Sequence, residues 1–287
     1  MRTQHTLGGT VHFDGFGYWS GQDIHVSLHP AEPNTGILFR RVDILGSSAI
    51  PGNIRHRSES PRRTTLVAPD SSGAEVGMVE HLLAALVGME VDNVEIHCDA
   101  PELPGLDGSA KPIVQAIQSA GVISQSEPFR KRRLVRPLRL EEAGSWIQVT
   151  PASDGRTRFQ YEIDYGNHPA IPSGVFRFSC SEDDFAHEVA PSRTFILKHE
   201  AEQLRQHGFG LRVRPEEVLI MDESGPMQNT LRFDDECARH KLLDMMGDMV
   251  LLGFSVFGHF SAYRSGHQLN AKLVRELSQR ESEFFET

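Results

Sequence analysis

The predicted helix at residues 235–253 carries three side chains whose types and spacing could bind a divalent metal ion. His240, Asp244 and Asp248 follow one another at intervals of four residues, so they project from one face of the helix. An imidazole and a carboxylate one turn apart form a natural pair of ligands for such an ion. On its own, however, such a pair is more often an ordinary His–Asp pair on a helix surface, so a second element has to decide between the two interpretations.

The second element is the start of a strongly apolar helix, predicted over 77–89. Glu80 and His81 precede an apolar run there, and two adjacent polar groups at the start of a buried helix are costly unless they are satisfied. Ligation by His81, His240 and Asp244 would leave a fourth zinc position open, which is typical of catalytic sites. Glu80 could then take a proton from a bound water, whose pKa the metal lowers to about 7. The alternative is that Glu80 caps its own helix and that His81 is a hydrogen-bonded core histidine.

His267 is a candidate proton donor for the leaving group of such a reaction. It lies in a Gly-containing segment, 263–267, that we predict to be a loop, and no helical partner accounts for it. A single loop histidine is a weak signal, because most such residues are simply solvated. Its assignment depends on whether the fold brings it to the predicted metal ligands.

Strands and helices that could carry these residues occur in both halves of the chain. Alternation of apolar and polar residues predicts strands, and apolar residues at helical spacing predict helices. The predicted strands are 24–28, 36–42, 93–98, 138–140, 146–149, 159–163 and 218–221. The predicted helices are 77–89, a segment starting near 113, 195–206, 235–253 and 268–280. Because the two kinds of element do not alternate regularly, the pattern favours an α+β fold over a doubly wound sheet.

Two polar segments interrupt this pattern. Residues 51–75 are rich in Pro, Ser and Arg, and we expect an irregular excursion there. The basic run 129–136, closed by Pro137, is the best candidate for a domain boundary and is most simply a solvated linker. We therefore predict two domains, 1–130 and 131–287, which divide the predicted metal ligands between them.

Composition and charge exclude several classes of protein. The chain has 287 residues, of which 39% are apolar and 24% charged, so a sizeable core is available. A formal charge of −10 argues against nucleic acid as the main partner, because phosphate binding needs concentrated Lys and Arg. Three cysteines without C-x-x-C spacing fit a reducing compartment. With no signal-like N-terminus and no run of about 18 apolar residues, we expect a cytoplasmic protein without an integral membrane segment.

Four longer stretches carry a more specific signal. They are MVEHLLAAL at 78–86, DAPELPGLDGSA at 99–110, RHKLLDMMGD at 239–248 and GHFSAYRSGH at 258–267. In this order they resemble the UDP-3-O-acyl-N-acetylglucosamine deacetylase family, which performs the committed step of lipid A synthesis, and the resemblance runs from about residue 4 to 277. It implies two similar α+β domains, each a β-sheet packed on paired helices, with the active site between them.

For the reaction centre, the resemblance implies a zinc metalloamidase that hydrolyses the N-acetyl group of a UDP-3-O-acyl-N-acetylglucosamine and releases acetate. Zn²⁺ would be held by His81, His240 and Asp244, and Glu80 would be the general base. These roles agree with the reading from residue types and spacing, although His and Asp ligands accept iron as well as zinc.

The resemblance also implies the groups that would assist the reaction. His267 would be cationic, would stabilise the tetrahedral oxyanion and would then protonate the amine. Asp248 would orient His267, and Thr194 would help to hold the oxyanion. The enzyme would be a monomer.

The resemblance implies that the substrate is a nucleotide-sugar glycolipid, that three residues contact it and that its acyl chain lies in a hydrophobic passage. The contacting residues would be Lys241, which would meet the phosphate, Phe195 and Leu197. The insert near 164–178 would build a hydrophobic passage for the acyl chain. Without the family, residues 164–171 would read as a plain surface hairpin.

The chain departs from the family at three places, all of them on the side of substrate recognition. Trp19, within the segment 15–21, stands where the family has a histidine. The charged segment 212–217 replaces a glycine turn, and Leu197 replaces an aromatic residue. The alternatives are therefore a diverged paralogue that deacetylates another N-acetylated sugar or nucleotide sugar, and a catalytically silent ligand-binding homologue.

Overall fold

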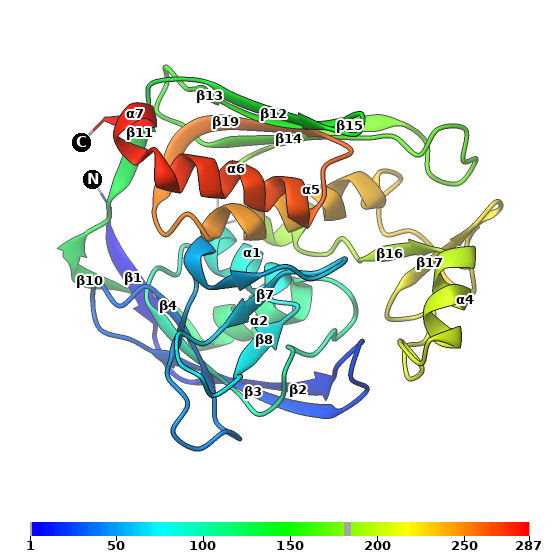
Figure 1. The fold of residues 1–287 in the computed structure, drawn as a ribbon, viewed down its shortest axis with the longest axis horizontal. Helices are drawn as coiled ribbons and strands as arrows, with labels where there is room; N and C mark the ends of the chain where they lie inside the picture. Colours follow the sequence, from blue (N-terminus) through cyan, green and yellow to red (C-terminus); the bar gives the residue numbers. More distant parts are fainter. Residues whose placement is uncertain (1, 181–184, 287) are drawn as a thin grey trace.

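Two β-sheets enclose a double layer of helices, so the chain folds into four layers (Figure 1). The computed structural model describes residues 2–180 and 185–286. Each sheet is amphipathic, with one face on the helices and the other exposed, which gives its strands the alternation seen in the sequence. The α+β fold of sheets packed on paired helices is confirmed.

The sheet of the first half lies at the bottom of Figure 1. Its strands are β2 (Val11–Phe16), β3 (Asp23–Pro30), β4 (Ile37–Arg41), β5 (Ile50–Pro51) and β9 (Val94–Cys98), in the order β2-β3-β9-β4-β5. Ile24, Val26 and Leu28 of β3 are buried against the helices of this half. These helices are α1 (Glu80–Gly88) and α2 (Lys111–Ala120).

The larger sheet at the top belongs to the second half. Its strands are β11 (Lys131–Leu134), β12 (Leu138–Glu142), β13 (Ser145–Pro151), β14 (Arg158–Ile163), β15 (Gly174–Ser179), β19 (Ser255–Tyr263) and β20 (Phe285–Glu286). Strand β19 is its hub, since it pairs with β13, β14 and β11. Two helices, α5 (Glu236–Val250) and α6 (His267–Gln279), lie between this sheet and α1.

Smaller elements surround the layers. Two further sheets pair β1 (Thr3–Leu7) with β10 (Val122–Pro128), and β6 (Arg57–Ser58) with β7 (Thr65–Val67) and β8 (Glu75–Gly77). A third, with β16 (Phe195–Leu197), β17 (Leu219–Asp222) and β18 (Gly225–Pro226), stands beside α4 (Lys198–Gln206) at the right of Figure 1. Short helical turns are η1 (Ile54–His56), η2 (Phe185–Val189) and α7 (Glu281–Phe284).

The structure qualifies one prediction about a polar segment and corrects another. Residues 51–75 are mostly turns and coil, as predicted, but they also contain η1, β6, β7 and the first residue of β8, and these strands of two or three residues are too short to show periodicity. The basic run is not a linker, because 131–134 form β11 within the large sheet. Lys131 and Arg132 lie over the rings of Phe257 and Phe254, at 4.3 and 4.1 Å, so aromatic faces accommodate their charge.

One further boundary differs from the prediction, and one strand was not predicted. Residues 195–197 form strand β16, and the helix predicted over 195–206 begins only at Lys198. The segment 255–263 was not assigned to any element, yet it forms β19, the hub of the large sheet. Its burial alternates strictly along the strand, but glycine, histidine and serine among the alternating positions weaken the apolar signal.

The chain passes from the first half to the second between β10 and β11. Strand β10 pairs with β1, whereas β11 pairs with β19 and β20. The proposed boundary at 130/131 lies between these two strands. The division into the domains 1–130 and 131–287 stays a prediction.

Helices α1 and α5 are in close contact at the centre of the molecule, and one glycine permits this. A Cβ atom at Gly247 of α5 would overlap the carbonyl oxygen of Glu80 and lie 2.8 Å from its carbonyl carbon. A larger residue would therefore push the helices apart. This close contact brings the first turn of α1 against the face of α5 that carries the predicted ligands.

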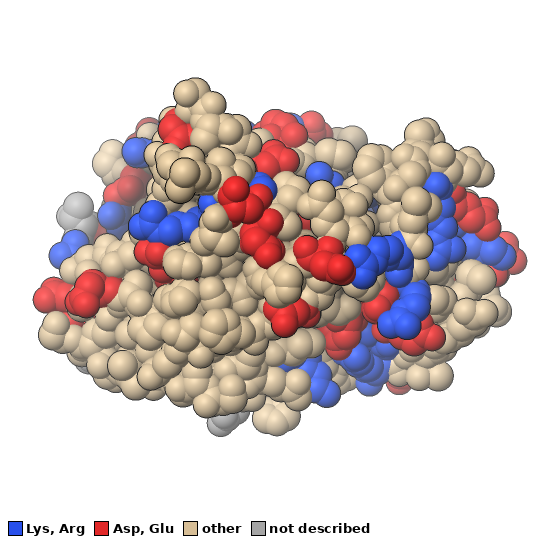
Figure 2. All heavy atoms as spheres, turned by 90° about the horizontal axis from the view of Figure 1, so that it is seen from below, with Lys and Arg blue, Asp and Glu red and all other residues tan. Residues whose placement is uncertain are grey.

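Surface charge is mixed on the face shown in Figure 2, where Lys and Arg side chains are interspersed with Asp and Glu. Nucleic-acid binding would need a concentrated basic stripe instead. Within residues 2–180 and 185–286, no helix is both long and apolar enough to cross a membrane.

Candidate active site

The fold brings the three predicted metal ligands together in the interior. His81 comes from the first turn of α1, and His240 and Asp244 come from successive turns of α5. One ligand atom from each residue lies within 4.8 Å of the others, and all three residues are buried. Oδ1 of Asp244 is 3.6 Å from Nε2 of His81 and 3.4 Å from Nε2 of His240. Two imidazole nitrogens facing one carboxylate are a donor set that could bind a metal ion.

Backbone contacts fix His240 in the state that a ligand requires. Its Nδ1 is 3.1 Å from the carbonyl oxygen of Ser192. A carbonyl oxygen only accepts, so Nδ1 carries the proton and the lone pair of Nε2 faces the other ligands. Burial lowers the pKa of His240 to about 3, which keeps the ring neutral. The ring is thus set in one tautomer before any ion binds.

Asp244 is held as a carboxylate by its neighbours. Burial alone would raise its pKa, but the charge of Lys241, together with the histidines that face the carboxylate, outweighs burial and holds the pKa well below its usual value. Nζ of Lys241 donates to Oδ2 of Asp244 at 2.6 Å, which leaves Oδ1 toward the histidines. Lys241, the predicted phosphate contact, therefore also orients a predicted metal ligand.

Glu80 lies beside this cluster, at the beginning of α1. Burial raises its pKa, and the nearby charge of His267 offsets only part of this effect. Its Oε2 accepts from the backbone N–H of Thr64 at 3.0 Å, so the side chain does not cap its own helix. A buried carboxylate with a raised pKa is suited to accept a proton in the reaction.

His267 was predicted to lie in a loop, but it is the first residue of α6. Its Nδ1 donates to Oδ2 of Asp248 at 2.8 Å, and its Nε2 faces Oε1 of Glu80 and Oδ2 of Asp244, each at 3.9 Å. Burial alone would lower the pKa of His267, but the Asp248 carboxylate outweighs this and raises it to about 9. The imidazole is therefore cationic at neutral pH, and it points at the predicted base and ligand.

Two residues that sequence reasoning missed complete this group. The hydroxyl of Thr64 donates to Oδ1 of Asp248 at 2.6 Å, and the amide of Asn270 donates to Oδ2 at 2.8 Å. Thr64 thereby contacts both Asp248 and Glu80, and both new residues are buried. Asn270 is one turn after His267, a spacing that could have signalled it, whereas no local pattern marks Thr64.

The cluster opens into a cavity of about 570 Å³. Thr194 and Phe195 line it beside His240, and Thr194 is fixed by donating its N–H to the carbonyl of Gly108 at 2.8 Å. Tyr165, from the segment between β14 and β15, also lines the cavity and meets Phe195 edge to face at 5.6 Å. Leu197 instead packs, half-buried, against the hydrophobic core. Thr194 and Phe195 thus line the cavity as predicted, whereas Leu197 is not among the residues that line it.

The unusual Trp19 forms part of the cavity wall. Its ring meets Phe209 edge to face at 5.5 Å, and the guanidinium of Arg63 lies 4.4 Å from the ring centre. The buried carboxylate of Glu102, another residue that we missed, accepts from the backbone N–H groups of Trp19 and Ser20 at 3.1 and 2.5 Å. These contacts fix the position of the aromatic wall.

The charged segment 212–217 contributes a single residue to the lining of the cavity. Arg212 extends to the carbonyl of Gly21 and to Asp23, and Val213 is the member of this segment that lines the wall. Trp19 and the segment 212–217, which depart from the family in sequence, thus change the cavity wall. They leave the cluster of His81, His240 and Asp244 intact.

An α+β protein with a buried His₂Asp cluster, an adjacent carboxylate and a cationic histidine at a cavity has the make-up of a metal-dependent hydrolase. Comparison with known proteins narrows this class. Residues 4–279 match the family model described as LpxC, UDP-3-O-acyl N-acetylglycosamine deacetylase. The chain belongs to this family.

Individual relatives are similar over nearly their whole length. A UDP-3-O-acyl-N-acetylglucosamine deacetylase of Thermosynechococcus vestitus is 40% identical over 277 residues, which cover 96% of this chain and 94% of the relative. The proteins of the same name from Vibrio campbellii and Neisseria meningitidis are 37% and 33% identical, each over 96% of this chain and over 90% and 89% of the relative.

Proposed function

We propose that this chain hydrolyses the N-acetyl group of a UDP-3-O-acyl-N-acetylglucosamine and releases acetate, as a step of lipid A biosynthesis. The observation that carries the proposal is that His81, His240, Asp244, Glu80 and His267, which come from three helices, meet at one cavity. Membership of the family and the names of the relatives supply the substrate.

We propose Zn²⁺ as the ion, because neutral imidazoles and one carboxylate are a usual ligand set for a catalytic zinc. When bound, the ion would polarise the acetyl carbonyl and lower the pKa of water. His81, His240 and Asp244 would hold it.

The acid–base steps fall to the two groups beside the cluster. Glu80 takes a proton from the water whose oxygen bonds to the acetyl carbon. His267, kept protonated and oriented by Asp248, stabilises the negative charge that develops on the carbonyl oxygen. It then gives its Nε2 proton to the sugar nitrogen as the C–N bond breaks, and Thr194, which also lines the cavity, supports the oxyanion.

The two ends of the substrate extend along the cavity. Lys241 is proposed to meet a phosphate, since its ammonium lies on the cavity wall beside the cluster. Phe195 is proposed to contact the substrate next to Thr194. The acyl chain is proposed to follow the segment 164–178, from which Tyr165 reaches the cavity.

Mass spectrometry of purified, zinc-loaded protein tests the proposal directly. Incubation with UDP-3-O-acyl-N-acetylglucosamine should release acetate and leave a product lighter by one acetyl group. Glu80→Gln should retain the metal and lose at least about 100-fold in rate, which is what one general acid–base group usually contributes.

The same assay separates the alternatives. Protein that retains its metal, leaves this substrate unchanged and deacetylates another N-acetylated nucleotide sugar would be the diverged paralogue. Metal retention without turnover of any of them would indicate the silent ligand-binding homologue. Cytoplasmic location and a monomeric state stay predictions, to be checked by fractionation and by sedimentation.

A further inference from the structure

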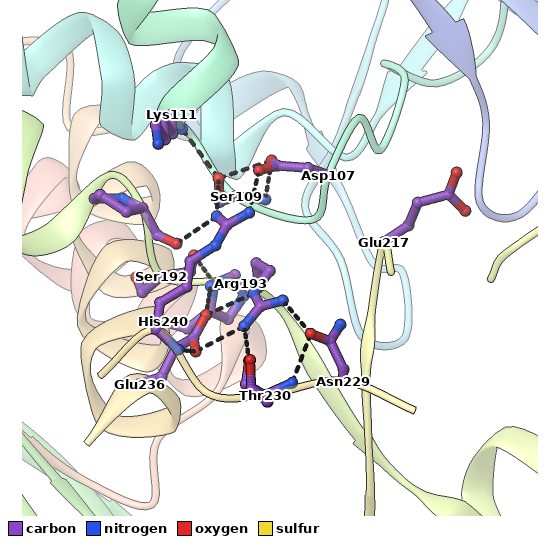
Figure 3. A network of polar contacts seen from close by, with 12 residues as sticks. Asp107, Ser109, Lys111, Ser192, Arg193, Glu217, Asn229, Thr230, Glu236 and His240 are labelled. Carbon is purple, nitrogen blue, oxygen red and sulfur yellow. Dashed lines mark hydrogen bonds and ion pairs between the residues drawn. The ribbon is translucent and has the colours of Figure 1, made fainter. Parts of the chain in front are cut away.

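A buried ion pair lies one helical turn before the metal ligand His240, outside the chemistry described above (Figure 3). Glu236, in the first turn of α5, is fully buried, and Arg193 is 4% exposed. Nε of Arg193 donates to Oε1 of Glu236 at 2.8 Å, and its Nη2 donates to Oε2 at 3.1 Å. Such a pair costs desolvation, so it is weak support for stability alone and calls for another role.

Glu236 also binds backbone, and this ties the pair to the site. Its Oε1 accepts the N–H of Arg193 at 3.0 Å, and its Oε2 accepts the N–H of Arg232 at 2.6 Å. One carboxylate therefore holds both the side chain and the main chain of Arg193. The guanidinium also donates hydrogen bonds to Oδ1 of Asn229 at 2.9 Å and to the carbonyl of Thr230 at 2.6 Å. These bonds fix the plane of the group.

The two residues on either side of Arg193 both belong to the candidate active site. The carbonyl of Ser192, directly before Arg193, accepts the hydrogen bond that Nδ1–H of His240 donates. Thr194, directly after it, lines the cavity as the proposed oxyanion group. Glu236 and His240 are also four residues apart on one face of α5. A shift of Arg193 would consequently move the carbonyl that sets the tautomer of His240.

We propose that Glu236 and Arg193 are positioning residues: their ion pair holds the carbonyl of Ser192 against His240 and thereby prepares this ligand for the metal. The proposal rests on the metal-dependent function proposed above. Groups that orient a ligating histidine through its second nitrogen typically change metal affinity by about 10- to 100-fold when they are altered.

Metal binding by the metal-free protein tests this without reference to turnover. Glu236→Gln keeps the shape of the side chain and removes its charge. We expect its Zn²⁺ affinity, measured by competition with a chromophoric chelator, to fall by about 10- to 100-fold. The visible spectrum of bound Co²⁺ should change as well, because its bands depend on ligand geometry. In turnover, kcat should fall while KM stays near the wild-type value.

Two further variants make the outcome decisive. Arg193→Met combined with Glu236→Met removes both charges, so no buried charge is left unpaired and the chain should fold even if Glu236→Gln does not. Asp235→Asn is the matched control, because Asp235, directly before Glu236 at the N-cap of α5, forms a partly exposed ion pair with Arg239. Metal affinity and Co²⁺ spectrum at wild-type values in the folded double variant would overturn the proposal. Failure of the wild-type protein to bind metal would instead refute the proposed function.

Discussion

Replacing Gly247 with alanine should damage the site from a position that contacts no substrate. The new Cβ would overlap the carbonyl oxygen of Glu80 and lie 2.8 Å from its carbonyl carbon, whereas ordinary contacts begin near 3.4 Å. Helices α1 and α5 must therefore separate by at least about 0.6 Å, and by more at the oxygen. Overpacking of this kind costs about 1–3 kcal/mol of folding free energy.

The larger consequence is for chemistry, because the two helices carry different parts of the site. Glu80 and His81 would move away from His240 and Asp244, and a displacement of about 1 Å can cost about 100-fold in rate. We expect Gly247→Ala to remain folded, with a lower melting temperature, weaker Zn²⁺ binding and a kcat reduced by one to two orders of magnitude.

Differential scanning calorimetry, chelator competition and the acetate-release assay measure these three quantities on the same preparation. Gly9→Ala is a suitable control, since no atom lies within 4 Å of the Cβ that it would add. Should Gly247→Ala bind metal and turn over substrate like the wild type, the spacing of α1 and α5 would not be what sets the geometry of the site.

Other expectations follow from the charges and the cavity wall. The pKa of His267 is about 9 in the folded chain and near 6.5 when unfolded, so its protonation stabilises the fold fully below about pH 6.5, and this contribution is lost as pH rises through 9. In the metal-free protein, Asp248→Asn should weaken this dependence of the unfolding free energy on pH, because Asp248 contributes most among the carboxylates that raise the pKa of His267; an unchanged dependence would contradict the role given to Asp248. Removing the ion with a chelator should lower the melting temperature, since a ligand at 100 times its Kd contributes about 2.7 kcal/mol, and scanning calorimetry before and after chelation would show it. Trp19→Ala should raise KM several-fold with little change in kcat, because the ring forms cavity wall and packs against Phe209 and Arg63; a loss confined to kcat would argue against this placement.

The parts of the site that could be predicted are those encoded within one helix or one turn. His240, Asp244 and Asp248 were found because a spacing of four residues places side chains on one face of a helix. Glu80 and His81 were found because polar residues stand out at the start of an apolar run. The order and type of most elements were predictable for the same reason, since periodicity is a local property.

The rest depends on contacts between distant segments, which no local pattern reports. Thr64 joins Glu80 and Asp248 only because the short sheet β6-β7-β8 is folded against α1 and α5. Glu102 supports Trp19 across a loop, and strand β19 pairs with three others despite its mixed composition. The first turn of α6 was read as a loop because its glycine suggested a break rather than a cap.

The strand pairing also sets an order of events during synthesis. Strand β20, at 285–286, pairs with β11, at 131–134, and β19 fills the space on the other side of β11. The larger sheet therefore cannot be completed until the segment around 286 has left the ribosome, whereas the five strands of the other sheet all lie before residue 99 and can pair much earlier. His81 belongs to the first half of the chain and would stay exposed to solvent and to free metal ions until α5 has been synthesised and packs against α1. Capture of the metal would thus mark a late stage of folding, and a nascent chain halted before residue 236 should be unable to retain it.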